Sequence, residues 1–218
     1  MKPYYDCDGI TIYHGDCREV LPTLPRADLL LTDPPYGIGA DNQSRILSRE
    51  KLAKPKDYGV SDWDKERPDV RIIEASIRFA DIAIVWGGNY FGLEASSCWL
   101  VWDKDNFTND FADCELAWTN MTRAVRKFKW RWNGMLQEEM GDKKENRVHP
   151  TQKPLALMRW CLSFAPDAKT ILDPFMGSGT TLVAAKREGR KAVGIELEER
   201  YCEAAVKRLQ QGVFDFDS

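Results

Sequence analysis

The chain contains 218 residues, of which 43% are hydrophobic and 30% are charged. This length and apolar content allow one sizeable core, or a core with a small appendage, and exclude a largely disordered chain. No apolar run approaches the roughly 18 residues that a membrane-spanning helix needs. Residues 1–9 carry charges where a signal peptide would be apolar. The composition therefore predicts a soluble cytoplasmic protein with no membrane partner.

The formal net charge is −3, so a polyanionic partner would have to be met by a local basic patch rather than by the whole surface. The six cysteines are scattered and contain no CxxC pair, and the two histidines share no metal-ligand spacing with them. These features predict reduced thiols and no metal site.

Three apolar runs that end at chain-breaking residues are expected to form buried strands. Residues 27–32 stop before two consecutive prolines, Pro34 and Pro35, which cannot continue a hydrogen-bonded ladder. Residues 82–86 and residues 98–102 show the same pattern of an apolar run followed by a breaker. Both later runs are expected at the centre of the sheet.

Further strands and helices alternate along the chain. Residues 10–13 and residues 170–172 are predicted strands, and the second is followed by a glycine-containing turn and a helix over 180–188. Another strand over 191–195 leads into a helix over 198–211. Such alternation predicts an α/β fold with a mostly parallel sheet covered on both faces, and ligands at the carboxyl ends of its strands.

Two polar stretches interrupt this pattern, residues 39–70 and residues 121–147. In the second stretch basic and aromatic side chains alternate, so a strand there would have one basic and one aromatic face. Such a face would contact phosphates and set register more than it would read bases. An edge strand with a solvated basic face explains the pattern equally well. The candidate phosphate-contacting residues are Arg45, Arg49, Arg126, Lys127, Lys129 and Arg131.

The turn Asp33-Pro34-Pro35-Tyr36 has the chemistry to hold an amino group beside a flat ring. Two prolines fix the backbone and remove two donors, which leaves carbonyl groups and the Asp33 carboxylate as acceptors. Tyr36 offers a stacking face. The structural alternative is a proline-rich turn with an aromatic plug.

The turn from Asp173 to Thr180 resembles a nucleotide-binding loop, but it lacks the third glycine of GxGxxG and the lysine of a P-loop. A pyrophosphate ligand is therefore disfavoured. Glu196 ends the next predicted strand, where a ribose-binding acid would lie, so the pair indicates an adenosine-containing ligand without phosphates. The structural alternative is that the glycines only let a helix approach the sheet.

Together with the segment His149-Pro150-Thr151-Gln152-Lys153-Pro154, these two turns resemble the S-adenosylmethionine-dependent amino-methyltransferases of DNA, in the permuted motif order called the beta class. The resemblance extends from Gly15 to Glu196. It implies a Rossmann-like class I methyltransferase fold with a mostly parallel seven-stranded sheet. It also implies one catalytic domain over 1–218, in which residues 39–70 and 121–147 would serve DNA recognition.

The resemblance also assigns roles to individual residues. The target amine and its base would be held by Asp33, Pro34, Pro35 and Tyr36. Asp16 would contact the adenine of the cofactor and Glu196 its ribose. The cofactor-binding set is Asp16, Thr151, Lys153, Asp173, Phe175, Gly177, Ser178, Gly179, Thr180 and Glu196. For His149, a role in opening the following helix is preferred to a role as general base.

In such an enzyme the amine attacks the sulfonium methyl group in line, and the target base is flipped out of double-stranded DNA. Methylation at cytosine C5 is disfavoured, because no cysteine lies on a predicted site loop. Family members with Asp before Pro-Pro-Tyr are mostly adenine-N6 enzymes, which favours that target over cytosine N4. Transfer to RNA or protein, or a non-catalytic DNA-binding module, are less favoured alternatives. A homodimer remains open, because dimers occur among relatives.

Overall fold

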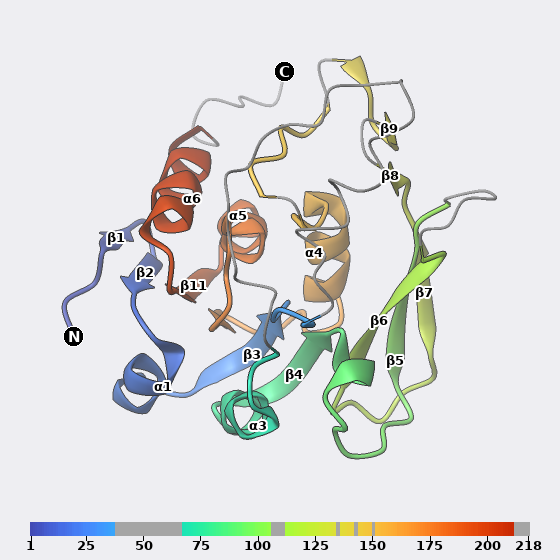
Figure 1. Cartoon of the computed structure of the whole chain (residues 1–218), viewed down its shortest axis with the longest axis horizontal. Coiled ribbons are helices and arrows are strands. Elements are labelled where there is room, and N and C mark those ends of the chain that lie inside the picture. The colour runs from blue at the N-terminus through green and yellow to red at the C-terminus, as the bar shows by residue number, and fades with distance from the viewer. Residues whose placement is uncertain (38–66, 106–111, 134–135, 142–143, 150, 212–218) are drawn as a thin grey trace.

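The computed structural model describes residues 1–37, 67–105, 112–133, 136–141, 144–149 and 151–211. Within them, nine strands form one sheet in the order β1-β2-β11-β10-β3-β4-β6-β5-β7, and β8 pairs with β9 in a separate ribbon (Figure 1). The strands are β1 (Tyr5–Cys7), β2 (Ile10–His14), β3 (Ala27–Thr32), β4 (Ala80–Trp86), β5 (Trp99–Asp103), β6 (Cys114–Thr119), β7 (Arg126–Lys129), β8 (Trp132–Asn133), β9 (Leu136–Gln137), β10 (Thr170–Asp173) and β11 (Lys191–Glu196). The helices are α1 (Cys17–Val20), α3 (Val70–Arg78), α4 (Leu155–Leu162), α5 (Thr180–Arg187) and α6 (Glu199–Gln211), with short 3-10 turns η1 (Leu21–Thr23) and η3 (Gly88–Tyr90).

The middle of the sheet is parallel, which confirms the predicted α/β class. Strands β2, β11, β10, β3 and β4 all run in one direction, while β6 lies antiparallel between β4 and β5. The described sheet has nine strands rather than the expected seven. The difference comes from two short edge strands, because β1 pairs with β2 and β7 pairs with β5.

The expectation that residues 98–102 form a central strand was wrong. The strand β5 lies next to the outermost strand β7, and Cys98 precedes it. Its two tryptophans and two aliphatic residues gave it the apolar character of a central strand. Trp102 is buried through contact with the core rather than by a central position in the sheet.

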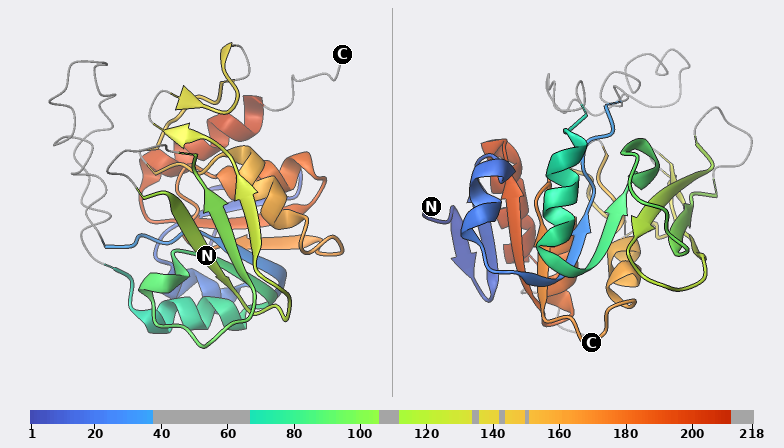
Figure 2. Two further views of the ribbon diagram at one scale, coloured as in Figure 1. Left: turned by 90° about the vertical axis from the view of Figure 1, so that its right-hand side faces the viewer. Right: turned by 90° about the horizontal axis from the view of Figure 1, so that it is seen from below.

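Two hydrophobic clusters cover opposite faces of the sheet, as the alternation of side chains along a strand requires. In β3, Leu29 and Leu31 pack with residues of α4, α5 and α6, whereas Leu30 packs with residues of α1 and α3. Figures 1 and 2 show the resulting three layers. Among the described residues, no helix is long and apolar enough to cross a membrane.

The two ends of the described chain meet in the sheet. β2 pairs in parallel with β11, with Gly194 opposite Ile12, and α6 packs against β2. The second strand, β2, is therefore adjacent to the last, β11, as the permuted motif order requires. Because β2, β11, β10 and β3 are parallel neighbours, the turns that follow them all lie at one edge of the sheet.

Candidate active site

Four acidic residues lie at the carboxyl ends of four neighbouring parallel strands: Asp16 after β2, Glu196 in β11, Asp173 in β10 and Asp33 after β3. All four line a cavity of about 470 Å³. The predicted residues that line it are Asp16, Asp33, Pro35, Thr151, Lys153, Asp173, Phe175, Gly177, Ser178, Thr180 and Glu196.

The remaining predicted site residues with described positions, Pro34, Tyr36 and Gly179, lie outside this lining. Gly179 precedes α5 with φ +77°, and a Cβ there would come within 2.8 Å of the Ala205 Cβ in α6. The structural alternative therefore explains Gly179, whose missing side chain lets α6 approach closely.

Gly177 and Glu196 form the other side of the same turn. The Gly177 N–H donates to Glu196 Oε2 at 3.0 Å, and the Glu198 N–H donates to Oε1 at 2.8 Å. Burial raises the pKa of Glu196 from its usual 4.5 to about 7, against the lowering effect of these two donors. The two backbone donors thus fix the orientation of the carboxylate at the cavity wall, and any further donor would stabilise its ionised form.

Asp173 and Asp16 occupy different environments on the cavity wall. Asp173 is buried, accepts from the Thr32 hydroxyl at 2.8 Å, and has its pKa raised to about 6 by burial. Asp16 caps α1 by accepting from the Arg18 N–H at 2.8 Å, and hydrogen bonds from the Arg18 side chain lower its pKa. Asp16 therefore remains ionised, whereas Asp173 titrates nearer neutrality.

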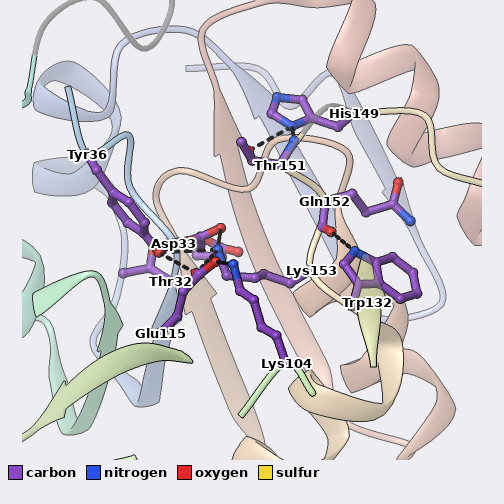
Figure 3. Close-up of polar contacts among 11 residues, drawn as sticks. Thr32, Asp33, Tyr36, Lys104, Glu115, Trp132, His149, Thr151, Gln152 and Lys153 are labelled. Carbon is purple, nitrogen blue, oxygen red and sulfur yellow. Dashed lines mark hydrogen bonds and ion pairs between the residues drawn. The ribbon is translucent and has the colours of Figure 1, made fainter. Parts of the chain in front are cut away.

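Asp33 and Tyr36 contact each other directly within the proline turn (Figure 3). The Tyr36 hydroxyl donates to Asp33 Oδ1 at 2.6 Å. The Tyr36 ring stacks on Tyr90 with centroids 5.1 Å apart, and a Cβ at Gly87 would fall 2.1 Å from the Tyr36 ring. Gly87, with φ +66°, is therefore needed for this ring position, since no other residue leaves the space.

Asp33 is also joined to a buried cluster of charged side chains that the sequence did not indicate. The Lys153 Nζ lies 2.7 Å from Asp33 Oδ2 and 3.0 Å from Glu115 Oε2, and it donates to the Tyr36 hydroxyl at 3.2 Å. The other Glu115 oxygen pairs with Lys104. Figure 3 shows these side chains converging from β6, from the end of β5 and from the segment before α4.

Burial and pairing act in opposite directions on the pKa values in this cluster. Burial raises the pKa of Asp33, while Lys153 opposes that rise. Burial alone would also raise the pKa of Glu115, but Lys153 and Lys104 outweigh it and lower this pKa to about 2. Burial alone would lower the pKa of Lys153, but Asp33 and Glu115 raise it. The lysine is therefore an ammonium held between two carboxyl groups.

The segment before α4 is anchored to the cofactor-loop side of the cavity as well. Gln152 Oε1 accepts from the Val148 N–H at 3.0 Å and from the Ser178 hydroxyl at 3.4 Å. The His149 Nδ1 accepts from the Thr151 N–H at 3.3 Å, and burial lowers the pKa of His149 to about 3. A neutral, buried His149 therefore helps to fix the segment that precedes α4, while the N-cap of that helix is Pro154.

The predicted basic strand forms only in part, as β7, at the edge of the sheet. Phe128 and Trp130 pack against the core, while Lys127 pairs with Asp103 at 3.1 Å and Lys129 pairs with Asp105 at 2.9 Å. Arg131 pairs with Asp105 as well, and Arg126 is exposed. The two predicted DNA contacts in the first polar stretch, Arg45 and Arg49, lie outside the described residues.

The sequence analysis did not identify Lys104 or Glu115 as site residues, and it did not predict that Lys153 would contact Asp33. Lys153, predicted to bind the cofactor, lines the cavity, and its ammonium also contacts Asp33. The one available signal is Glu115, a charged residue inside the otherwise apolar strand β6. A buried charge needs a partner, but the sequence does not indicate which one.

Comparison with known proteins supports the resemblance inferred from the motifs. A family model described as DNA methylase, N6_N4_Mtase, matches residues 103–207. The Type II methyltransferase M.ScaI of Streptomyces caespitosus is 28% identical over 96% of this chain and 84% of its own. M2.LlaDCHI of Lactococcus lactis subsp. cremoris, also a Type II methyltransferase, is 29% identical over 97% of this chain and 93% of its own.

A solved structure shares the fold of this chain. The crystal structure of the M1.HpyAVI-SAM complex superposes with a TM-score of 0.58 at 25% identity, covering 92% of this chain and 98% of that one. The fold, the motifs and the relatives agree, which confirms the family inferred from the sequence. The family model and the relatives thus support an S-adenosylmethionine-dependent DNA amino-methyltransferase of the N6-adenine/N4-cytosine family.

Proposed function

We propose that this DNA methyltransferase transfers the methyl group of S-adenosylmethionine to N6 of adenine in duplex DNA, with Asp33 as the acceptor of the amine hydrogens. One observation carries the proposal: Asp33 and Glu196 line the same cavity, at the ends of β3 and β11. A carboxylate suited to an amine therefore lies across a single cavity from one suited to a ribose.

The cavity fits the cofactor in size and chemistry. A volume of about 470 Å³ is within the range of small-molecule sites. Glu196 would accept hydrogen bonds from the two ribose hydroxyls, beside the Gly177 amide that already orients it. Asp16 would accept from the adenine amine and Asp173 would face the amino acid end. When bound, S-adenosylmethionine supplies an electrophilic methyl group on a cationic sulfur.

The residues of the Asp33 turn would orient the attacking nitrogen. Neither Pro34 nor Pro35 has a backbone N–H, so this turn presents acceptors to an incoming amine. Asp33 and a backbone carbonyl would take the two amine hydrogens and direct the nitrogen lone pair at the methyl group. As positive charge develops on that nitrogen, the ionised Asp33 would stabilise it. Tyr36, already stacked on Tyr90, would offer its ring to the flipped base.

The preference for adenine rests on Asp, rather than Ser, before Pro-Pro-Tyr. Purified protein incubated with labelled cofactor and duplexes of mixed sequence is expected to yield N6-methyladenine after digestion to nucleosides. Mass spectrometry separates this product from N4-methylcytosine. Exclusive formation of N4-methylcytosine would overturn the base assignment while leaving the acceptor role of Asp33 in place.

We further propose that the basic residues of β7 contact DNA phosphates. Changing Arg126, Lys127 and Lys129 together to Glu is expected to weaken DNA binding at low salt. A plot of the logarithm of the DNA-binding constant against the logarithm of the salt concentration should also become less steep, by up to about 3 in slope. Each lost phosphate contact reduces the magnitude of this slope by roughly 0.9. Fluorescence anisotropy over a salt series measures both quantities.

A matched control reverses three exposed cations at the amino ends of the central strands β4, β10 and β11, away from β7: Arg78, Lys169 and Lys191. Their reversal alters net charge equally but is expected to leave the salt slope within about 0.5 of wild type. Equal slopes for the two triple variants would show that β7 makes no phosphate contacts.

A further inference from the structure

The cluster of Lys104, Glu115 and Lys153 around the Asp33 turn has no role in the proposed function so far. Its side chains come from separate parts of the chain and converge beside Asp33, as Figure 3 shows. The Lys153 side chain is only 5% exposed, and those of Asp33 and Glu115 are about 20% and 19% exposed. A charge cluster this buried costs free energy unless its members are paired well.

The hydrogen-bonding capacity of the Lys153 ammonium matches its surroundings. It has three N–H donors, and three acceptors lie within reach: Asp33 Oδ2 at 2.7 Å, Glu115 Oε2 at 3.0 Å and the Tyr36 hydroxyl at 3.2 Å. The Tyr36 hydroxyl in turn donates to Asp33 Oδ1. Each oxygen of Asp33 therefore has one fixed partner, which locks the plane of the carboxylate. Each oxygen keeps a further lone pair for an incoming amine.

We propose that Lys153 and Glu115 are positioning residues for methyl transfer: Lys153 holds the Asp33 carboxylate ionised and oriented toward the target amine, and Glu115 holds Lys153. This inference rests on the proposed acceptor role of Asp33. It places Lys153 with the base-binding half of the site rather than with the cofactor.

The charge balance explains why both residues are needed. A lone ammonium beside Asp33 would keep the carboxylate charged but would oppose positive charge developing on the nearby amine nitrogen. Glu115 compensates for this, because it pairs with the same ammonium from the other side. Lys104 holds the far oxygen of Glu115 and keeps that carboxyl group charged. The site can then stabilise a cationic transition state without an unpaired buried charge.

The proposal predicts opposite effects on Asp33 for the two substitutions. Lys153 lowers the pKa of Asp33 and Glu115 raises it, so Lys153→Met should raise that pKa and Glu115→Gln should lower it. The other groups acting on Asp33 stay the same in both variants. They are Tyr36, which donates to Asp33, and Asp173 on the neighbouring strand, whose own pKa Asp33 raises. Lys104 loses its carboxylate partner only in Glu115→Gln, where its positive charge adds to the expected lowering of the Asp33 pKa.

Single-turnover methylation with preformed complexes at saturating cofactor and DNA measures the chemical step across pH. In Lys153→Met, the rate at neutral pH is expected to fall about 10²-fold, with its acid limb moved to higher pH by about one unit or more. In Glu115→Gln, the acid limb is expected to move to lower pH. Lys153→Arg should restore part of the rate, because it keeps the charge. Cofactor affinity should change by less than about threefold in all three variants.

A second readout does not depend on activity. The side-chain carboxyl carbon of Asp33, labelled with ¹³C and followed by NMR across pH, reports the titration of the group directly in wild type, Lys153→Met and Glu115→Gln. The surface pair of α6 supplies matched controls, Glu203→Gln and Lys207→Met, whose side chains are 56% and 73% exposed. These controls should move neither the NMR titration nor the acid limb.

The outcomes separate this inference from the proposed function. The inference would be overturned if the Asp33 titration shifted in the same direction in Lys153→Met and Glu115→Gln, or did not shift in either variant. This holds even if the enzyme methylates adenine. A large loss of cofactor affinity in Lys153→Met would overturn it too, and would assign Lys153 to the cofactor. Transfer to cytosine with opposite shifts would overturn the adenine assignment alone. If Lys153→Met fails to fold, the downward shift in Glu115→Gln still decides the matter.

Discussion

Asp33→Ala is expected to reduce methyl transfer by at least about 10³-fold while leaving cofactor affinity within a few-fold of wild type. The substitution removes both carboxylate oxygens that would accept the amine hydrogens, and with them the charge that would stabilise the transition state. The cofactor side of the cavity is formed by the turns after β10 and β11, which Asp33 does not support. Transfer of labelled methyl groups to DNA and calorimetric binding of the cofactor measure the two effects.

Asp33→Asn provides the matched control for this prediction. It keeps the shape of the side chain and one acceptor oxygen but loses the charge, so an intermediate loss of about 10²-fold is expected. Glu115 still pairs with Lys153 in both variants, which limits the structural damage. Loss of cofactor binding together with transfer would show that Asp33 belongs to the cofactor site, contrary to this account.

Glu196→Ala is expected to weaken cofactor binding about 10²-fold. The substitution would remove the hydrogen bonds that two ribose hydroxyls donate to a charged acceptor. Each such bond is worth about 1.5–3 kcal/mol. A total loss of about 3 kcal/mol weakens binding about 10²-fold. The Gly177 and Glu198 amides, which now donate to this carboxylate, would also lose their acceptor. Calorimetric titration measures the change, with Glu203→Gln as a control on the surface of α6. An unchanged affinity would remove Glu196 from the cofactor site.

The raised pKa of Glu196, about 7, gives this prediction a pH dependence. In the free protein, the ionised carboxylate is the better acceptor, so cofactor affinity should increase as pH rises through 7 and should lose that dependence in Glu196→Gln. Stability changes in the opposite direction. Because the folded-state pKa lies above the usual 4.5, the contribution to stability is present below 4.5 and is lost as pH rises through about 7. As pH rises from about 5 to about 8, the unliganded Glu196→Gln protein should therefore lose less stability than the unliganded wild-type protein.

The sheet and the cofactor side of the site were predictable because local sequence signals marked them. Strand β3 ends where two prolines forbid a ladder, and β10 leads into a glycine turn whose Gly177 amide meets Glu196. Parallel neighbours then bring Asp33, Asp173 and Glu196 to one edge without any knowledge of side-chain contacts. Within the glycine turn, Gly179 fits the structural interpretation because its missing side chain allows close packing, whereas Gly177 lines the cavity, as a ligand-binding turn would require.

The base-binding side was only half predictable, since its contacts join distant parts of the chain. Asp33, Glu115 and Lys153 come from three separate segments, and no periodicity or spacing connects them. Similarly, the apolar residues of β5 do not distinguish a central strand from one near the edge that is covered by aromatic packing. The basic pattern of β7 did not indicate that Asp103 and Asp105 would pair with its lysines.

The most direct test is a crystal structure of the protein with S-adenosylhomocysteine, the product left after methyl transfer. The account predicts the ribose hydroxyls at Glu196 and the sulfur facing the Asp33 turn, inside the cavity that both residues line. A product molecule bound away from Asp33, or seated with its ribose remote from Glu196, would contradict the account.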